Sequence, residues 1–269
     1  MIKTKNLFSA VTLLTVMTLL MFTGGCKEEP NATPDTSYEL KVKDVLGVKG
    51  TVTFTETSAT TATITISLIG APAGTHPAQL CMKSAVEGGV AAVILNPVDA
   101  NGKSSTVVTD MTYDELIGYD GYIKVLKSET EPDVILAQGD IGGNALTGIK
   151  KNYVLTSLGS FAVTGNALFE KRENGSTLVT ITLAGGVAGE VYPATINIGS
   201  VATVGGGPVT MLLNVVNGTT GLSYTNIRKL DSGLAISYDN WLVYDGYLNI
   251  YQTSVISGVV ISHGNIGSN

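Results

Sequence analysis

The chain offers few side chains for metal or acid–base chemistry. It has two histidines, His76 and His263, and two cysteines, Cys26 and Cys81. Copper and zinc sites need several clustered imidazoles or thiolates, which two distant histidines do not supply. No Ser-His-Asp set can be assembled either, because "GSTLV" and similar stretches lack the turn that presents a nucleophilic serine. We therefore expect a protein that is not an enzyme and uses no cofactor.

Four aspartates recur at matched positions and could bind a hard cation. Asp114 and Asp120 are repeated as Asp239 and Asp245. Carboxylates with nearby backbone oxygens are the usual ligands of calcium. Turn and helix-cap roles explain the same aspartates more simply, so we expect those roles and keep calcium binding as an alternative. Cys81 is expected to be a small buried hydrophobic residue.

The tetrapeptide "YDGY" occurs at residues 119–122 and 244–247 as part of an internal duplication. The segment "GTVTF" matches "GNALF" at an offset of 115 residues. Within "TATITISLIG" and "TLVTITLAGG", Ile64, Ile66 and Leu68 match Val179, Ile181 and Leu183 at the same offset. "AGTHPAQL" matches "AGEVYPATI" with an offset that becomes 116, and "TYDELIGYDGY" matches "SYDNWLVYDGY" at 125. We assign the nine inserted residues (125 minus 116) to a loop around "NGTTGLSYTN", because loops absorb insertions more readily than strands.

The matched segments alternate apolar residues with Thr or Ser, which is the pattern of half-buried strands. With many Gly, Asn and Asp turns, the sequence predicts an all-β protein of two tandem antiparallel Greek-key-like β-sandwich domains, at residues 38–146 and 153–269. One short helical turn is expected at "TYDEL", where Thr112 and Glu115 have capping-box spacing. In YDGY, Asp-Gly should form a tight turn, with the tyrosines packing at the start of the next strand.

The N-terminus resembles a bacterial lipoprotein signal. Lys3 and Lys5 precede an apolar run that ends in "TGGC", so we expect residues 1–25 to be removed and Cys26 to be acylated. Residues 26–37 then form a flexible tether, whose "CKEE" start is similar to export signals of Bacteroidetes-type surface lipoproteins. Without Lys3 and Lys5 the formal net charge falls from −6 to −8, which makes nucleic acid an unsuitable partner. The expected location is the outer membrane of a bacterial cell envelope, with surface exposure as one option.

The order "GTVTF", "AGTHPAQL", "LNPVD", "YDGYIKV" and "AQGDIG" resembles the CHRD domain, named for chordin. The resemblance covers nearly all of residues 45–144 and, more weakly, residues 160–269. It implies a Greek-key sandwich similar to that of superoxide dismutase, and an extracellular interaction domain. Family members share a His-Pro-x-His element and a late histidine. The three equivalent positions hold His76, Gln79 and Leu126 in the first copy, and Tyr192, Thr195 and Tyr251 in the second, degenerate copy.

These observations favour a non-enzymatic binding or adhesion module that is held at the membrane by its N-terminal lipid. Its partner would be an unidentified protein or glycan. The alternatives are a metal-binding or superoxide-dismutase-like protein and a purely structural envelope protein. Exposed aromatic rings would favour binding, and buried rings would favour the structural role. The candidate binding surface comprises His76, Gln79, Tyr119, Tyr122, Tyr192, Trp241, Tyr244, Tyr247 and Tyr251.

Overall fold

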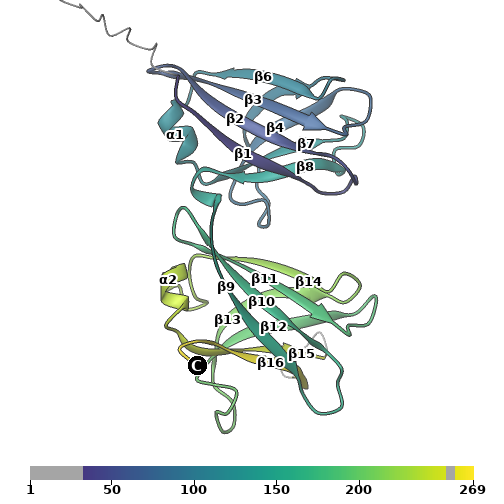
Figure 1. Ribbon diagram of the computed structural model, residues 1–269, viewed down its shortest axis with the longest axis vertical. Helices are drawn as coiled ribbons and strands as arrows, with labels where there is room; N and C mark the ends of the chain where they lie inside the picture. Colours follow the sequence, from purple (N-terminus) through teal and green to yellow (C-terminus); the bar gives the residue numbers. More distant parts are fainter. Residues whose placement is uncertain (1–32, 253–257) are drawn as a thin grey trace, which may run out of the picture. The chain divides into compact units, whose positions relative to one another are not determined.

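The structure is a computed structural model that describes residues 33–252 and 258–269. The expected signal peptide, Cys26 and most of the tether lie outside these residues. Within them, no helix is long and apolar enough to cross a membrane. The regular structure is almost entirely β, in two antiparallel eight-stranded sheets that each approach a closed barrel (Figure 1). This confirms the predicted all-β fold with two tandem β domains.

The two sheets have the same topology. The first has the spatial order β5-β4-β7-β8-β1-β2-β3-β6 and the second β13-β12-β15-β16-β9-β10-β11-β14, so each strand of the second corresponds to the strand eight numbers earlier. The strands of the first sheet are β1 (Asp35–Val42), β2 (Lys49–Ser58), β3 (Thr61–Ile69), β4 (His76–Met82), β5 (Ala91–Val98), β6 (Lys103–Val108), β7 (Gly121–Leu126) and β8 (Ile135–Ile141). Those of the second are β9 (Leu146–Ser157), β10 (Thr164–Arg172), β11 (Thr177–Ala184), β12 (Val191–Ile198), β13 (Val209–Asn217), β14 (Leu222–Ile227), β15 (Asp245–Tyr251) and β16 (Val260–Gly267).

Each sheet encloses its own apolar core, and the alternating strands supply much of it. In β3, Ile64 and Ile66 are buried while the threonines between and around them face outward or are half-buried. Val179 and Ile181 have the same place in β11. Because side chains alternate across a strand, this period of two buries one face and leaves the other polar. The core of each copy follows directly from the pattern that predicted the strands.

A small polar latch holds the two end strands of each sheet together. Ser104 Oγ donates to the carbonyl of Asn96 at 2.6 Å, and the Asn96 amide N–H donates to Thr106 Oγ1 at 2.8 Å. The Asn96 side chain also donates to the Ser105 carbonyl at 2.7 Å. The second sheet repeats all three bonds around Asn214. The latch thus joins β5 to β6, and β13 to β14. These strands are the two ends of each sheet and are not paired with each other in the strand order.

The strand registers show where the second copy gained residues. Ala62 pairs with Val108 between β3 and β6, and Thr177 pairs with Ile227 between β11 and β14. Ala62 and Thr177 are 115 residues apart, and Val108 and Ile227 are 119 apart, whereas the YDGY motifs are 125 apart. Six of the nine inserted residues (125 minus 119) therefore lie in the segment 228–237. The expectation that the whole insertion surrounds "NGTTGLSYTN" is wrong, because that stretch forms a hairpin that contains only one extra residue.

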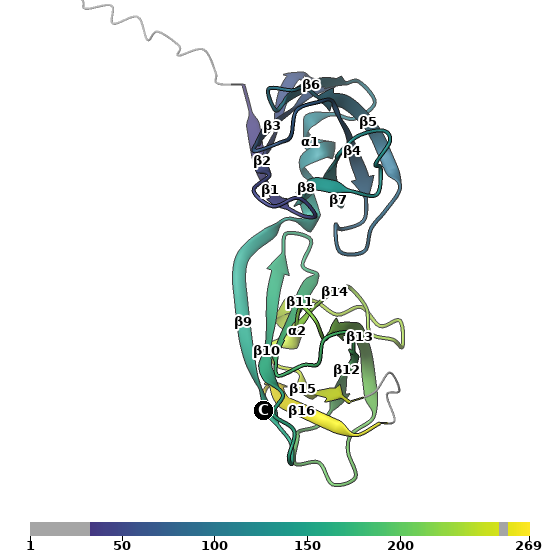
Figure 2. The same cartoon turned by 90° about the vertical axis from the view of Figure 1, so that its right-hand side faces the viewer.

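Two short helices occupy matching places, α1 (Tyr113–Ile117) beside β2 and α2 (Tyr238–Trp241) beside β10 (Figure 2). The predicted capping box is present: the Glu115 N–H donates to Thr112 Oγ1 at 3.2 Å, and the Thr112 N–H donates to Glu115 Oε2 at 2.8 Å. Ser237 and Asn240 cap α2 in the same way. These side chains satisfy N–H groups that a helix start leaves without partners.

The connection between the sheets is shorter than the sequence suggested. A 3₁₀ turn, η1 (Gly142–Asn144), follows β8, and β9 begins at Leu146. Residues 147–152, which the sequence left between the two copies, are therefore part of the long strand β9. Their alternating polarity is weak because most of their side chains are exposed.

Candidate functional site

His76 begins β4 and is only 1% exposed. Its Nδ1 lies 2.6 Å from the carbonyl oxygen of Lys127, and its Nε2 lies 2.9 Å from the carbonyl oxygen of Pro72. Both ring nitrogens therefore face backbone carbonyls, and neither is open to a ligand. The arrangement ties two loops to the end of β4, so His76 is a structural residue and not part of a binding surface.

The three positions at which the CHRD resemblance places histidines do not converge on one point. In the second copy, Thr195 Oγ1 lies 3.4 Å from the hydroxyl of Tyr251, so these two positions meet on the outer face of the sheet. Tyr192 instead belongs to the core, where its hydroxyl accepts a hydrogen bond from the Val187 N–H at 2.7 Å. In the first copy, Gln79 lies on the outer face, away from the core residues that flank it.

The second tyrosine of each YDGY motif anchors a loop on the outer face. The Tyr122 hydroxyl accepts from the Gly89 N–H at 3.3 Å, and the Tyr247 hydroxyl accepts from the Gly207 N–H at 2.8 Å. These rings are 3% and 4% exposed. Burial raises the pKa of Tyr122 to about 12. The repeated motif thus fixes the β4–β5 and β12–β13 loops across their sheets.

The remaining flagged aromatic rings are also withdrawn from the surface. Trp241 is 0% exposed and packs against Phe169, with ring centroids 5.9 Å apart, and against Tyr244 at 4.9 Å. Tyr251 is 7% exposed, and Tyr119 is half-buried against the first core. The hypothesis of an exposed aromatic surface is therefore wrong for Trp241 and Tyr251, whereas Tyr119 and Tyr244 are partly buried. Such rings pack because a tyrosine or tryptophan contributes a large apolar area to a core.

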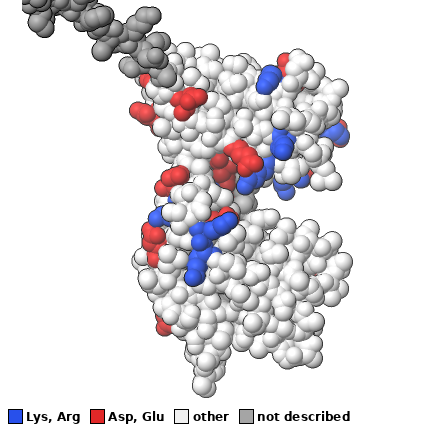
Figure 3. Space-filling view, viewed as in Figure 1, with Lys and Arg blue, Asp and Glu red and all other residues white. Residues whose placement is uncertain are grey.

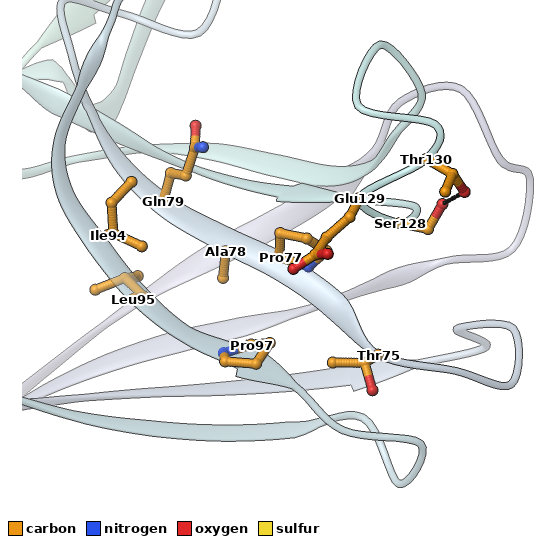
Figure 4. A pocket seen from close by; sticks show the side chains of 10 residues that line it. All are labelled: Thr75, Pro77, Ala78, Gln79, Ile94, Leu95, Pro97, Ser128, Glu129 and Thr130. Carbon is orange, nitrogen blue, oxygen red and sulfur yellow. Dashed lines mark hydrogen bonds between the residues drawn. The ribbon is translucent and has the colours of Figure 1, made fainter.

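A groove on the first copy remains as the candidate site, and Gln79 is the flagged residue that it contains (Figure 4). Its volume is about 500 Å³, and it crosses the outer face of β4 and β5. Gln79 and Ile94 are directly opposite each other in the β4–β5 pairing. The lining residues are Thr75, Pro77, Ala78, Gln79, Ile94, Leu95, Pro97, Ser128, Glu129 and Thr130.

The groove combines an apolar floor with a few polar groups at its edge. Ile94 is 70% exposed, which is unusual for a large aliphatic side chain in the middle of a strand. Glu129 is exposed on the loop that forms one wall, where Ser128 and Thr130 hydrogen-bond through their hydroxyls at 3.0 Å. Such a mixture can bind an apolar segment and orient it through the amide of Gln79 and the carboxylate of Glu129.

The buried thiol next to the groove is not arranged for reaction. Cys81 is 0% exposed, and its Sγ donates to Gln79 Oε1 at 3.8 Å. Desolvation by burial raises the pKa of the thiol, although the charge of Lys124 acts in the opposite direction. A nucleophilic cysteine needs a lowered pKa and access to substrate. Cys81 therefore has the structural role that the sequence indicated.

The histidines and aspartates form no metal centre in the part of the chain that the structure describes. No group of three or more His, Cys, Asp or Glu side chains there could hold an ion. Asp120 pairs with Arg228 at 2.7 Å, Asp239 pairs with Lys171 at 2.8 Å, and Asp245 accepts from Asn269. Burial lowers the pKa of His263, which disfavours its charged form.

A cluster of polar contacts that the sequence did not reveal connects residues at β7, β8 and η1 to Arg172 of β10 and to Arg228, which follows β14. The buried Arg172 donates through Nη1 to Asp140 Oδ2 at 2.7 Å and to the Asn144 carbonyl. Arg228 donates to Asp120 Oδ2 at 2.7 Å and to Asn144 Oδ1 at 2.6 Å. The aspartate of the first YDGY motif therefore belongs to this cluster. The only sequence signal for this cluster is that "KRENG" in the second copy differs from its counterpart "ETSAT" in the first.

Comparisons with family models, with curated proteins and with solved structures found no match to the chain.

Proposed function

We propose that this protein is a non-enzymatic, lipid-anchored component of a bacterial cell envelope that binds a partner through the groove of its first copy. The groove is the observation that carries the proposal. Its exposed Ile94 lines the groove together with Pro97 and Gln79, so an apolar ligand segment would bury surface that is now in water. The N-terminal resemblance to an outer-membrane lipoprotein supports the location, with the folded part held outside the cytoplasm.

The chemistry of the groove favours a polypeptide over a glycan. Glycans are commonly held by flat aromatic rings, and most rings of the candidate surface are buried, with only Tyr119 and Tyr244 partly exposed. Proline and aliphatic side chains with one amide and one carboxylate suit an extended peptide with alternating apolar and polar groups. The resemblance to the CHRD domain, an extracellular interaction module, supports the same function. Burial of the rings favours the alternative of a purely structural envelope protein, which has no discrete ligand.

Photo-crosslinking on intact cells separates these two functions. A benzophenone amino acid is placed at Ile94, in the groove, and at the similarly exposed Val154 of β9, outside it. We expect a discrete adduct from position 94 alone, suppressed by excess unmodified protein but not by excess Gln79→Trp protein. The variant Cys26→Ala should lower the adduct yield, because the chain would no longer be held at the membrane. Equal adducts from positions 94 and 154, or none from either, would favour the structural role.

A further inference from the structure

The two copies differ in charge beside their short helices, although the backbone there is the same. Glu56 of β2 and Lys171 of β10 are equivalent at the offset of 115 that pairs Phe54 with Phe169. Glu56 pairs with Ala62 of β3, and Lys171 pairs with Thr177 of β11, which is the residue equivalent to Ala62. Each strand lies against its helix, α1 or α2. The two copies therefore have opposite charges, Glu56 and Lys171, at equivalent positions beside α1 and α2.

The second copy shows what a cation does at this place. Lys171 Nζ lies 2.8 Å from Asp239 Oδ2 and 6.0 Å from the centroid of the Tyr238 ring. A carboxylate and an aromatic face are the two groups that bind an ammonium ion most directly. The α2 helix supplies both, from consecutive residues. The second copy thus fills its own ammonium site with a lysine from the neighbouring strand.

The first copy keeps the binding groups and lacks the lysine. Tyr113 and Asp114 of α1 correspond to Tyr238 and Asp239, but Glu56 takes the place of Lys171. Among the described residues, no lysine or arginine forms an ion pair with Glu56, Asp114 or Glu115. By this equivalence Glu56 and Asp114 stand where the other copy holds an ammonium group against a carboxylate, and Glu115 follows in α1, where its carboxylate also caps the helix.

The surface beside α1 is also hollowed. A depression of about 590 Å³ is lined by Met111, Asp114, Glu115, Gly118, Tyr119 and Asp120. It shares Asp114 and Glu115 with the place described above and adjoins it, since Glu56 and Tyr113 are not part of its lining. Met111 and Tyr119 give it an apolar base that suits the methylene chain of a lysine, while the carboxylates of Asp114 and Glu115 are exposed at its edge. In Figure 3, acidic side chains gather on this side of the first sheet.

We propose that this α1 surface, defined by Glu56, Tyr113, Asp114 and Glu115, binds a lysine-bearing segment of a basic polypeptide. The incoming ammonium group occupies the position that Lys171 Nζ has in the second copy, between the Asp114 carboxylate and the Tyr113 ring. The adjacent Glu56 and Glu115 carboxylates attract further positive charge on the same segment. This surface is separate from the groove of β4 and β5, so its function goes beyond the binding proposed there.

Exchanging the two charges tests the proposal. A fluorescent pentalysine peptide is titrated into the full chain in detergent at low salt, and we expect one peptide per chain. Glu56→Lys places a lysine where the second copy has one, and should weaken peptide binding about tenfold by filling the site internally. Lys171→Glu should create a second site and raise the stoichiometry to two. Asp133→Lys, with the same change of charge on an exposed loop away from α1, should change affinity by less than about twofold.

Several results would overturn the proposal. Equal weakening by Glu56→Lys and Asp133→Lys would show only general attraction to an acidic protein. An unchanged stoichiometry in Lys171→Glu would show that the second copy is not a filled version of the same site. Displacement of the peptide by one equivalent of Ca²⁺ would assign the carboxylates to a metal ion.

Asp114→Asn, which keeps the shape of the side chain, should also weaken peptide binding. Circular dichroism establishes that each variant is folded. Substitutions at Ile94 in the groove should leave the peptide affinity unchanged.

Discussion

The two copies have the same scaffold, but they use equivalent positions on its outside differently. The first copy has a groove at Gln79, and among the described residues no lysine or arginine pairs with Asp114 or Glu115 of α1. In the second copy, Thr195 at the position of Gln79 bonds to Tyr251, and Lys171 neutralises Asp239. The contact of Thr195 with Asn197 repeats that of Gln79 with Cys81, so the two copies differ here by the added contacts of Tyr251 and Lys171. Duplication has here kept the strands, the latch and the loop anchors while the surfaces diverged.

Between β8 and β16 it is the first copy that has the additional contact. Asp140 of β8 bonds through one oxygen to the Ala85 N–H at 2.7 Å and through the other to Arg172. Its counterpart Asn265 retains only the first contact, with the Val201 N–H at 2.8 Å. The loop contact is thus part of the common scaffold, whereas the charge of Asp140 serves the contact with the β10–β11 hairpin.

Removal of Arg172 should give the largest difference in unfolding free energy between equivalent substitutions in the two copies. Arg172→Ala leaves Asp140 without its charged partner, and breaking a buried ion pair costs about 3 kcal/mol of unfolding free energy. The equivalent Thr57→Ala in the first copy should cost less than about 0.5 kcal/mol, because Thr57 is exposed. Urea denaturation of both variants measures the difference. Equal losses at the two positions would mean that the charged cluster adds nothing to the scaffold that the copies share.

The duplication, the strands and the first helix could be predicted because each depends on a local pattern. Period-two alternation gave β3 and β11, and the Thr112–Glu115 spacing gave the start of α1. The tyrosine positions depend on long-range structure. Tyr122 faces away from the core and is buried because the loop before β5 folds back over it, which no nearby residue indicates. An amphipathic ring under a loop and one on a surface have the same sequence pattern.

The latch and the groove were missed for a related reason. Asn96 and Ser104 are unremarkable polar residues until the β5–β6 hairpin places them together. The repeat of Asn96 as Asn214 within "LN" of both copies was the available signal. The inserted segment 228–237 was misplaced because composition alone favours Gly- and Asn-rich stretches as loops. Register, which depends on pairing partners, was needed to locate it.

The two anchor tyrosines, Tyr122 and Tyr247, should also differ in how they change the unfolding free energy at alkaline pH, by a smaller amount than the loss expected for Arg172→Ala. Burial, reinforced by the charges of Cys81 and Asp140, raises the pKa of Tyr122 to about 12 from an ordinary value of 10. A raised pKa in the folded state means that stability is fully present below pH 10 and is lost as the pH rises towards about 12. Tyr122→Phe should therefore lose about 2 kcal/mol less unfolding free energy between those pH values than the parent chain does.

Tyr247→Phe is the matched control for that measurement. It removes the equivalent loop anchor, but Asn197 and Asn265 stand where the first copy has Cys81 and Asp140. Urea denaturation at pH 9 and at about pH 11.5 compares the two variants. An identical pH dependence for Tyr122→Phe and the parent chain would show that this phenol does not control the alkaline transition.

The latch should give the smallest effect, and one that is equal in the two copies. Ser104 and its counterpart Ser223 are 7% and 4% exposed, and each donates to an asparagine carbonyl at 2.6 Å. Replacing either by alanine removes one buried hydrogen bond and should lower the unfolding free energy by about 1 kcal/mol. Equal values from denaturation would place the latch in the shared scaffold. A loss confined to Ser104→Ala would instead connect it to the groove, since Asn96 follows Leu95 in the strand that lines it.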